Sequence, residues 1–436
     1  MKKQQLIPVL AIVLLAMLTD CKFQPRHPEA INPPLNEQSV REYIRSEYDY
    51  TENWLSQYNT LRAIIKEELS SRFLKLPEPI KQKSDTAIME GGRWRVYIHE
   101  RKEIRAQSGG SLKTVYRLVA SGSDSVFIED FLVVNLQCLV LLLSNNLSTS
   151  IEITDIFTDK KSGAENKINF PEPEGNISGL SYDKENDRLE FVYSSCVTPP
   201  TCYAYGIHSM HLGILWKSKI QSFAREDYKA QILFMTGLKG RKIPVSVVKK
   251  IDEAKPDKPA PVAVFADCLK PGSPVSNFNP ALLCLLNRGF TIVRLHIPDG
   301  DTSVQRENDL ISDVVSSLVH NGIASPGMIT LVAAGPAATM AYICAQRHSS
   351  WFKTLVLENP PSLPLQAISG APFCLINSEY NNAVSENIIT GFVQEYRKKE
   401  KSENILLINK GKNINKDRAY MGDVITFILV SNEIDN

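Results

Sequence analysis

The sequence predicts an α/β protein in which a mostly parallel sheet is covered by helices on both faces. Three observations predict this fold and the two regions that lie before it in the chain. From residue 223 to the end, short apolar runs alternate with helical stretches, the pattern of a parallel sheet. Residues 81–222 contain short runs in which apolar and polar residues alternate, without helical stretches between them, and this pattern favours antiparallel strands. Before them lies an apolar stripe with helical spacing.

The first element is an export segment, and we expect residues 1–21 to be a signal peptide. Two lysines precede an apolar run from Leu6 to Leu18, which is too short for a comfortable membrane span. Leu18–Cys21 resembles a bacterial lipoprotein box, so Cys21 is a candidate for lipidation, although Asp20 replaces the usual small residue. An uncleaved anchor or a plain secretory signal is the alternative. Each version predicts an exported protein, periplasmic or membrane-anchored.

Residues 22–80 are expected to form a linker and one long helix. The linker from Pro25 to Pro34 is rich in proline, and the helix is predicted from Ser39 to Lys75. Prolines at 77 and 79 then end it. The stripe that predicts the helix consists of Tyr43, Tyr50, Trp54, Tyr58, Leu61, Ile65, Leu69 and Phe73.

Residues 81–222 are predicted to form an all-β unit. At about 40 to 50 residues for each four-stranded propeller blade, this length allows roughly three blades, too few to close a ring of the usual size. The runs that predict strands are 94–98, 115–120, 126–134, 139–143, 151–157, 189–193 and 203–205.

Residues 223–436 are predicted to form the α/β domain. Its expected strands are 262–266, 292–297, 329–332, 354–357, 373–376 and 405–408. Its expected helices are 281–286, 310–319, 337–347 and 386–399. In such sheets, ligands and catalytic residues lie beyond the carboxyl ends of the strands. The turns that follow these strands are therefore the places to search.

Composition excludes several classes of function. Lys plus Arg number 49 and Asp plus Glu 48, so the net charge of +1 gives no reason to expect a nucleic-acid partner. The basic run 397–399 is interpreted as a solvated helix end. Cys196 and Cys202 are close enough in sequence for a disulfide. The absence of a CxxC pair argues against a metal site, and no cofactor is expected.

Five segments carry a resemblance to a known family. They are 226–246, 285–297, 194–200, 168–173 and the helix around 48–69. In this order and spacing they resemble the oligopeptidase B branch of the prolyl oligopeptidases, serine peptidases of family S9. The resemblance implies an α/β-hydrolase domain capped by a β-propeller, and hydrolysis of short peptides, often after basic residues. The chain is shorter than the family norm, with central blades missing. Only 360–370 replaces a segment that helps to recognise basic side chains.

The nucleophile position of that family is altered in this chain. Hydrolases of this fold carry Gly-x-Ser-x-Gly between a strand and a helix. Here the corresponding turn is 333–337, and Gly335 stands where the serine should be. The next residue, Pro336, has no backbone N–H to donate to an oxyanion. The turn has therefore lost its attacking group and one oxyanion donor.

The remaining catalytic positions are altered as well. Asn381 takes the place of the family's aspartate, with Glu379 as a possible substitute nearby. The loop 409–415, which should hold the histidine, has none, and no histidine follows His348. The family's oxyanion tyrosine corresponds to Asp267. No catalytic residue is assigned to this chain.

The sequence therefore favours a non-catalytic, exported pseudoenzyme that acts as a binding or scaffold module. Expected partners are peptides or a protein, with the membrane contacted through the N-terminal lipid or signal anchor. An unclosed β-unit also favours a second copy or oligomer. One alternative is an active hydrolase with a relocated site, for which Thr339 and Ser325 are the nearest hydroxyls. A vestigial structural protein is the other.

Overall fold

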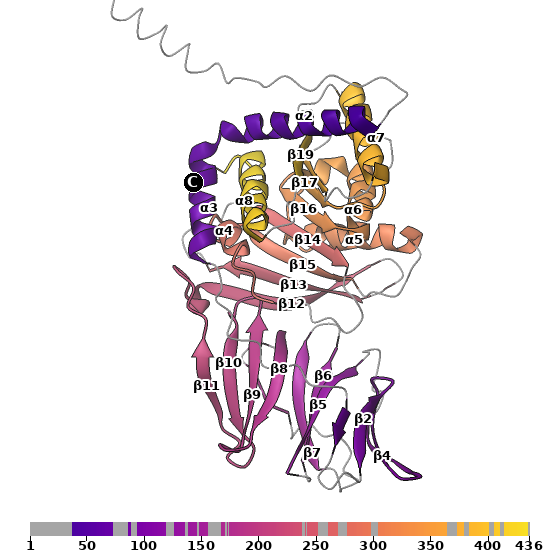
Figure 1. The fold of residues 1–436 in the computed structure, drawn as a ribbon. Helices are drawn as coiled ribbons and strands as arrows, with labels where there is room; N and C mark the ends of the chain where they lie inside the picture. The colour runs from indigo at the N-terminus through magenta and orange to yellow at the C-terminus, as the bar shows by residue number, and fades with distance from the viewer. Residues whose placement is uncertain are drawn as a thin grey trace, which may run out of the picture.

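The computed structural model describes residues 37–72, 86–88, 94–118, 126–135, 138–145, 148–155, 167–170, 172, 174–237, 240, 242–251, 260–268, 277–297, 304–363, 373–378, 383–400, 405–409 and 414–434. The expected signal peptide with Cys21, the linker and Asn381 lie outside the described residues. In Figure 1 a large sheet with its helices forms the upper part of the molecule, and three smaller sheets lie below it.

The large sheet, called the main sheet below, has eight strands in the order β12-β13-β15-β14-β16-β17-β18-β19. β13 runs antiparallel to both of its neighbours, and the remaining strands are parallel to one another. The strands are β12 (Tyr228–Thr236), β13 (Lys242–Lys250), β14 (Val262–Cys268), β15 (Thr291–Ile297), β16 (Ile329–Ala334), β17 (Phe352–Glu358), β18 (Phe373–Ser378) and β19 (Ile405–Asn409). The mostly parallel sheet matches the sequence-based expectation.

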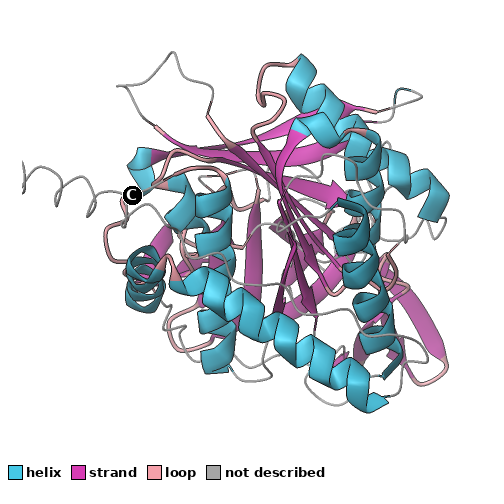
Figure 2. Ribbon diagram, turned by 90° about the horizontal axis from the view of Figure 1, so that it is seen from above, coloured by secondary structure: helices cyan, strands magenta, loops and turns pink. Residues whose placement is uncertain are grey.

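Helices cover both faces of the main sheet, as Figure 2 shows from above. They are α4 (Leu282–Leu286), α5 (Val304–His320), α6 (Pro336–Arg347), α7 (Ala383–Glu400) and α8 (Ile414–Ser431). Successive residues of a strand point to opposite faces. Val262 and Val264 accordingly pack in the core cluster that holds residues of α5, α6 and α7. Ala263 packs in the cluster that holds residues of α4 and α8. Because both faces are buried, the strands are continuous apolar runs.

The N-terminal stripe forms two helices rather than the single long helix expected. They are α2 (Glu37–Ser56) and α3 (Asn59–Ser71). At the break, Tyr58 leaves helical geometry, and its ring packs 5.0 Å from that of Trp54, which in turn lies 5.9 Å from Phe427 of α8. The chain turns here so that α3 can pack against α8. The spacing of the apolar residues did not reveal the break, because the apolar stripe continues from one helix into the other and both helices bury it.

The edge of the main sheet at β19 is covered by α2. The Leu407 N–H donates a hydrogen bond of 3.0 Å to the Thr51 hydroxyl, which occupies a donor that an open edge would leave to solvent or to another strand. The covered edge therefore cannot add a further strand at that position.

Only 10% of the Arg397 side chain is exposed, which corrects its interpretation as part of a solvated helix end. Its guanidinium forms an ion pair of 2.6 Å with Glu47 of α2, whose side chain is fully buried. The Tyr43 hydroxyl donates to the same carboxylate at 2.6 Å, and burial raises the pKa of Tyr43. Neighbouring Lys398 is exposed. The run of basic residues suggested that Arg397 faces solvent. This was wrong because α2, about 350 residues away in the chain, covers the Arg397 side chain.

Below the main sheet lie three antiparallel sheets, called here the first, second and third small sheets. The first contains β1 (Thr86–Ile88), β2 (Arg95–His99), β3 (Glu103–Ser108) and β4 (Ser111–Arg117). The second contains β5 (Phe127–Val134), β6 (Cys138–Ser144) and β7 (Thr149–Asp155). The third contains β8 (Gly175–Asp183), β9 (Arg188–Ser195), β10 (Thr201–Gly206) and β11 (Leu212–Lys217).

The second small sheet is packed between the other two. Leu139 and Leu141 of β6 share a core with residues of the first small sheet, whereas Val140 and Leu142 share one with the third. This two-sided burial explains why β6 is apolar at almost every position. Cys196 and Cys202, both described, are not joined by the disulfide considered from the sequence.

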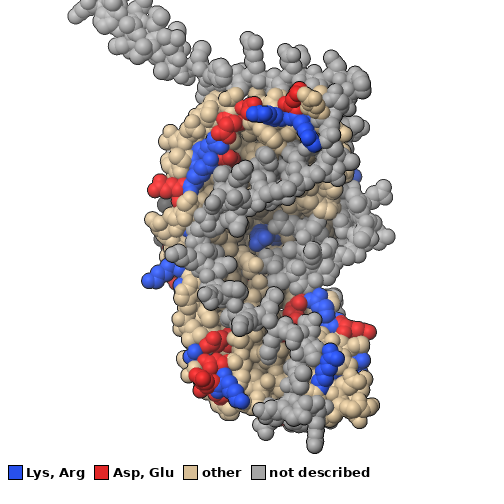
Figure 3. Space-filling view, in the orientation of Figure 1, with Lys and Arg blue, Asp and Glu red and all other residues tan. Residues whose placement is uncertain are grey.

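Basic and acidic side chains are interspersed on the face of the molecule seen in Figure 3. The described helices include none that is long and apolar enough to span a membrane.

Candidate functional site

The turn between β16 and α6 is the candidate site that the sequence pointed to. Gly335 occupies it with φ 57° and ψ −133°, a backbone conformation that side chains rarely adopt. Its N–H donates to the Glu358 carbonyl at 2.8 Å, and its own carbonyl accepts from the Ala338 N–H at 3.0 Å. Hydrogen bonds on both sides therefore hold a sharp strand-to-helix turn in place.

Space is available at this turn, but no reactive group is present. A Cβ built on Gly335 would meet no atom within 4 Å, and Pro336 is exposed. Pro336 begins α6, where its fixed φ suits the helix and its missing N–H costs no helical hydrogen bond. The turn itself can therefore supply neither a nucleophile at 335 nor an N–H donor at 336.

The other expected positions are only partly described. Asn381 falls between β18 and α7, outside the described residues. The loop predicted as 409–415 is shorter than expected, because Asn409 still belongs to β19 and α8 already begins at Ile414. Asp267 lies inside β14 rather than after it, with its backbone beside that of His296. The strand continues two residues past Ala266, so the position after it is not Asp267.

Two histidines lie away from the turn after β19. His348 caps the far end of α6, about 18 Å along the helix from Gly335, and stacks on Trp351 with ring centroids 4.1 Å apart. His320 is the exposed last residue of α5. Neither position follows β19, where a base for this turn would be expected.

The two hydroxyls considered as substitutes are also poorly placed. Thr339 is 7% exposed, and its hydroxyl donates to the Ser362 carbonyl at 2.6 Å. Ser325 precedes β16 at its amino end. The six-residue strand, about 20 Å long, therefore lies between Ser325 and the turn.

A buried polar cluster that sequence reasoning missed joins the third small sheet to the main sheet. Ser246 of β13 is its centre: the hydroxyl lies 2.6 Å from Glu174 Oε2 and 2.7 Å from His296 Nε2. Glu174, Ser246 and His296 are 2%, 0% and 2% exposed. Burial raises the pKa of Glu174 and lowers that of His296 to about 3. The imidazole is therefore neutral near pH 7.

These three residue types occur in serine hydrolases, but their arrangement here is different. In a triad the histidine lies between the serine and the carboxylate. Here Ser246 lies between them, and His296 Nδ1 has no hydrogen-bond partner among the described residues. The serine is also fully buried, so no substrate can reach it. The cluster connects Glu174, which directly precedes β8, with strands β13 and β15.

The only sequence signal for this cluster was the strand alternation that places Ser246 and His296 on one face; nothing pointed to Glu174. Among the described residues, no group of three or more His, Cys, Asp or Glu side chains is placed to hold a metal ion.

No family model matches the sequence, and no curated protein matches it. Solved structures do. Oligopeptidase B from Leishmania major has a TM-score of 0.59 at 16% identity, covering 78% of this chain and 58% of that one. Prolyl oligopeptidase B from Galerina marginata has a TM-score of 0.63 at 14% identity, covering 82% and 59%. A post-proline cleaving enzyme from Rickettsia typhi has a TM-score of 0.59 at 14% identity, covering 81% and 61%.

These similarities concern the fold, because the identities are low. They agree with the main sheet and its helices lying beside several antiparallel sheets (Figure 1). The protein shares the fold of these oligopeptidase B and prolyl oligopeptidase structures over the part that it covers, and it spans about three-fifths of their length.

Proposed function

We propose that this protein is a pseudoenzyme with the prolyl oligopeptidase fold, which binds a partner and does not hydrolyse peptides. The observation that carries the proposal is the turn at Gly335. Its backbone keeps the sharp conformation that would present a nucleophile, and there is room for a side chain, yet none is present. Pro336 removes an N–H from the position where an oxyanion donor is needed.

The alternative of a relocated catalytic site has little support. Among the described residues, Ser246 has a histidine within hydrogen-bonding distance, but it is fully buried and the order of the contacts is not that of a triad. Thr339 already donates its hydroxyl proton to a backbone carbonyl.

The connection from β17 to β18 supports the loss of peptidase specificity. Only residues 359–372 join the two strands, where the resembled family has a longer segment that recognises basic side chains. Together with a shortened propeller-like region, this favours a binding or scaffold role with a peptide or protein partner over turnover of the family's substrates.

The primary test is hydrolysis of a fluorogenic arginine-containing tripeptide by the purified protein. A prolyl oligopeptidase with an intact nucleophile turn serves as the positive control. We expect no turnover above buffer and no labelling by a fluorophosphonate, which reacts with activated serines. Turnover that follows the protein through further purification would overturn the proposal. Saturable binding of a partner would separate a binding role from a vestigial protein.

Export and anchoring at Cys21 are a second part of the proposal. In a bacterial host, metabolic labelling with palmitate should mark the protein, and Cys21→Ser should abolish the label. A labelled Cys21→Ser variant, or an unlabelled parent protein that stays in the cytoplasm, would contradict it.

A further inference from the structure

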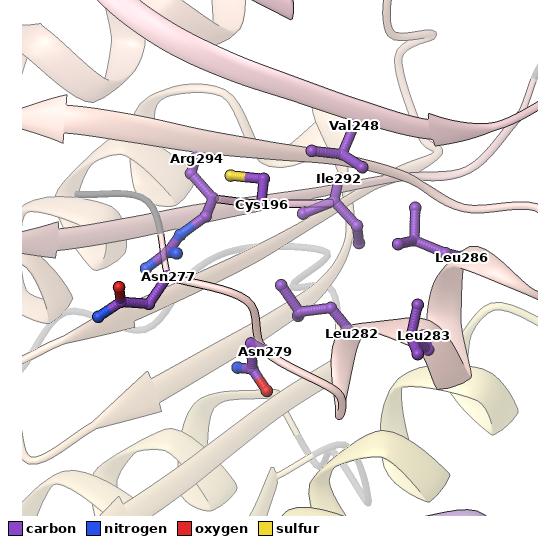
Figure 4. A pocket seen from close by; sticks show the side chains of 9 residues that line it. All are labelled: Cys196, Val248, Asn277, Asn279, Leu282, Leu283, Leu286, Ile292 and Arg294. Atoms are coloured by element: carbon purple, nitrogen blue, oxygen red, sulfur yellow. The ribbon is translucent and has the colours of Figure 1, made fainter. Parts of the chain in front are cut away.

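The junction between the third small sheet and the main sheet is closely packed. Figure 4 shows the side chains around a small cavity there, and its enclosed space holds about one water molecule. Four apolar side chains that line this cavity are 1–3% exposed: Val248, Leu283, Leu286 and Ile292. An exposed surface is therefore a stronger candidate for partner binding than this cavity.

Exposed apolar side chains gather on the hairpin that β10 and β11 form in the third small sheet. Among the described residues, eight large apolar side chains are exposed, and four of them lie within seven positions of this hairpin. They are Met210 (77% exposed), Ile214 (59%), Leu215 (44%) and Trp216 (36%). A single exposed apolar residue needs no explanation, but a cluster of them indicates a contact surface.

This apolar surface is the outer edge of a sheet. Among the described strands, β11 pairs only with β10, and Figure 1 shows β11 at the left margin of the small sheets. The register places Ile214 and Trp216 opposite successive residues of β10, which point to opposite faces. Leu215 is the extra residue between them. Apolar side chains therefore flank the edge on both faces.

The bulge at Leu215 makes this edge a poor template for another strand. The extra residue interrupts the ladder, and the charge of Lys217 lies on the same edge. A partner sheet packed on one face of the strand would also leave either Ile214 or Trp216 in water. A fluid medium, by contrast, can surround the edge from both faces.

The charge of the hairpin indicates which medium it fits. Residues 201–219 contain no Asp or Glu, and Lys217 and Lys219 are exposed beside the apolar edge. The neighbouring strand β9 has one acidic residue, Glu190, which pairs with Arg188 at 2.7 Å. Tryptophan and aliphatic side chains next to lysines form the kind of surface that binds anionic lipid headgroups.

The edge suits the headgroup layer of a bilayer rather than its hydrocarbon core. An open strand edge carries backbone N–H and C=O groups that have no partner in hydrocarbon, where leaving them unpaired is costly. In the headgroup layer, phosphate oxygens and water accept hydrogen bonds from such N–H groups. Binding at this depth still allows Ile214, Leu215 and Trp216 to reach the upper part of the acyl chains.

We propose that the β10–β11 hairpin binds the surface of a bilayer that contains anionic phospholipids. Ile214, Leu215 and Trp216 insert among the headgroups, and Lys217 and Lys219 pair with lipid phosphates. The contact holds the third small sheet against the membrane. It is independent of the proposed loss of catalysis and of lipidation at Cys21, because it uses neither.

The fluorescence of Trp216 gives a local test. The protein, carrying Cys21→Ser so that no lipid is attached, is mixed with vesicles of phosphatidylglycerol and phosphatidylcholine in which part of the lipid has brominated acyl chains. Bromine quenches tryptophan only at short range, so contact through the N-terminal segment alone leaves Trp216 unquenched. We expect quenching that Trp216→Phe abolishes and that Trp94→Phe, directly before β2, retains. Vesicles of phosphatidylcholine alone should quench little.

Variants of the same hairpin separate charge from apolar contact in quenching titrations. Lys217→Gln should weaken binding about fivefold, the effect of one lysine at an anionic surface, and added salt should weaken binding of the parent protein. Leu215→Ser should weaken it about tenfold by removing an apolar side chain that leaves water. Matched controls lie on β4, another edge strand: Leu112→Ser and Lys113→Gln, at exposed positions, should bind like the parent protein.

Several results would overturn the inference: no quenching by anionic vesicles, equal quenching of Trp216→Phe and the parent protein, or equal binding to phosphatidylcholine alone. If the hairpin instead joins two copies of the chain, sedimentation without vesicles will show a dimer that Trp216→Ala dissociates, and this also overturns it. Melting temperatures of the variants are measured first. If Trp216→Phe does not fold, Lys217→Gln and Leu215→Ser with their β4 controls still decide the outcome.

Discussion

Two regions next to the main sheet differ in the side chains that they present. At the end of β16, the turn at Gly335 keeps its backbone geometry and hydrogen bonds but presents no side chain. At the contact between α2 and α7, by contrast, Arg397 and Glu47 keep a buried ion pair of 2.6 Å. A buried pair of charges is costly to desolvate and persists only with good geometry.

The two regions make different demands on their side chains. The ion pair needs particular side chains, 350 positions apart, and both are present. The turn needs only a residue that tolerates a positive φ, and glycine does so best. The side chains that hold the two helices together are thus present, whereas the turn carries no side chain that could react, which fits the proposed pseudoenzyme.

The largest effect is expected from Glu47→Ala. It leaves Arg397 buried without its partner, so the free energy of unfolding should fall by about 3–5 kcal/mol. Urea denaturation measures the change. Lys398→Ala, at the exposed neighbouring position, should stay within about 0.5 kcal/mol of the parent protein. If Glu47→Ala and Lys398→Ala lowered the free energy of unfolding by similar amounts, the ion pair would not stabilise the fold as proposed.

The buried cluster at the junction should make stability depend on pH through His296. Its pKa in the folded protein, about 3, is below the ordinary 6.5. Its contribution is therefore fully present above pH 6.5 and is lost as pH falls toward 3. Glu174, with a raised pKa, acts in the opposite sense: its contribution is present at low pH and lost as pH rises through its folded pKa.

His296→Gln isolates the first effect, since Glu174 remains. Between pH 6.5 and 5, the free energy of unfolding of the parent protein should fall by about 2 kcal/mol more than that of the variant. Urea titrations at both pH values measure this difference. His320→Gln, at the exposed end of α5, should follow the parent protein. Parallel pH curves for the parent and His296→Gln would show that the histidine is not buried in its neutral form.

The turn itself should tolerate a serine at a moderate cost. Gly335→Ser meets no atom but must adopt φ 57°, so we expect a loss of about 1–2 kcal/mol and still no peptide hydrolysis. Ala334→Ser, one residue earlier in ordinary strand geometry, is the matched control and should be nearly neutral. Hydrolysis by Gly335→Ser alone would mean that a base lies near the turn after all.

The smallest effect is expected from Pro336→Ala. It restores an N–H but gives up the reduced freedom of proline in the unfolded chain, so stability should fall by about 0.4–1 kcal/mol. Combined with Gly335→Ser, it restores a hydroxyl and a donor together. Fluorophosphonate labelling of this double variant should remain at the level of the parent protein. Strong labelling would place the general base within reach and contradict the proposal.

Much of the fold could be predicted because its signals are local. The main-sheet strands are apolar runs, and the turn at Gly335 was found between a predicted strand and a predicted helix. The break between α2 and α3 could not be predicted, since the apolar stripe continues across it and only packing on α8 bends the chain. The burial of Arg397 was likewise invisible, because the residue that pairs with it belongs to a distant helix.

The reactive groups that are absent from the expected positions can be identified from the amino-acid sequence. A glycine has no nucleophilic side chain and a proline has no backbone N–H. No histidine follows His348 in the sequence, whatever the fold. Which distant residues lie together depended on the tertiary structure: Glu174, Ser246 and His296 meet at one junction, and Arg397 meets Glu47. The physical reason is that an absent group is a property of composition, whereas a contact between distant residues depends on how strands and helices pack.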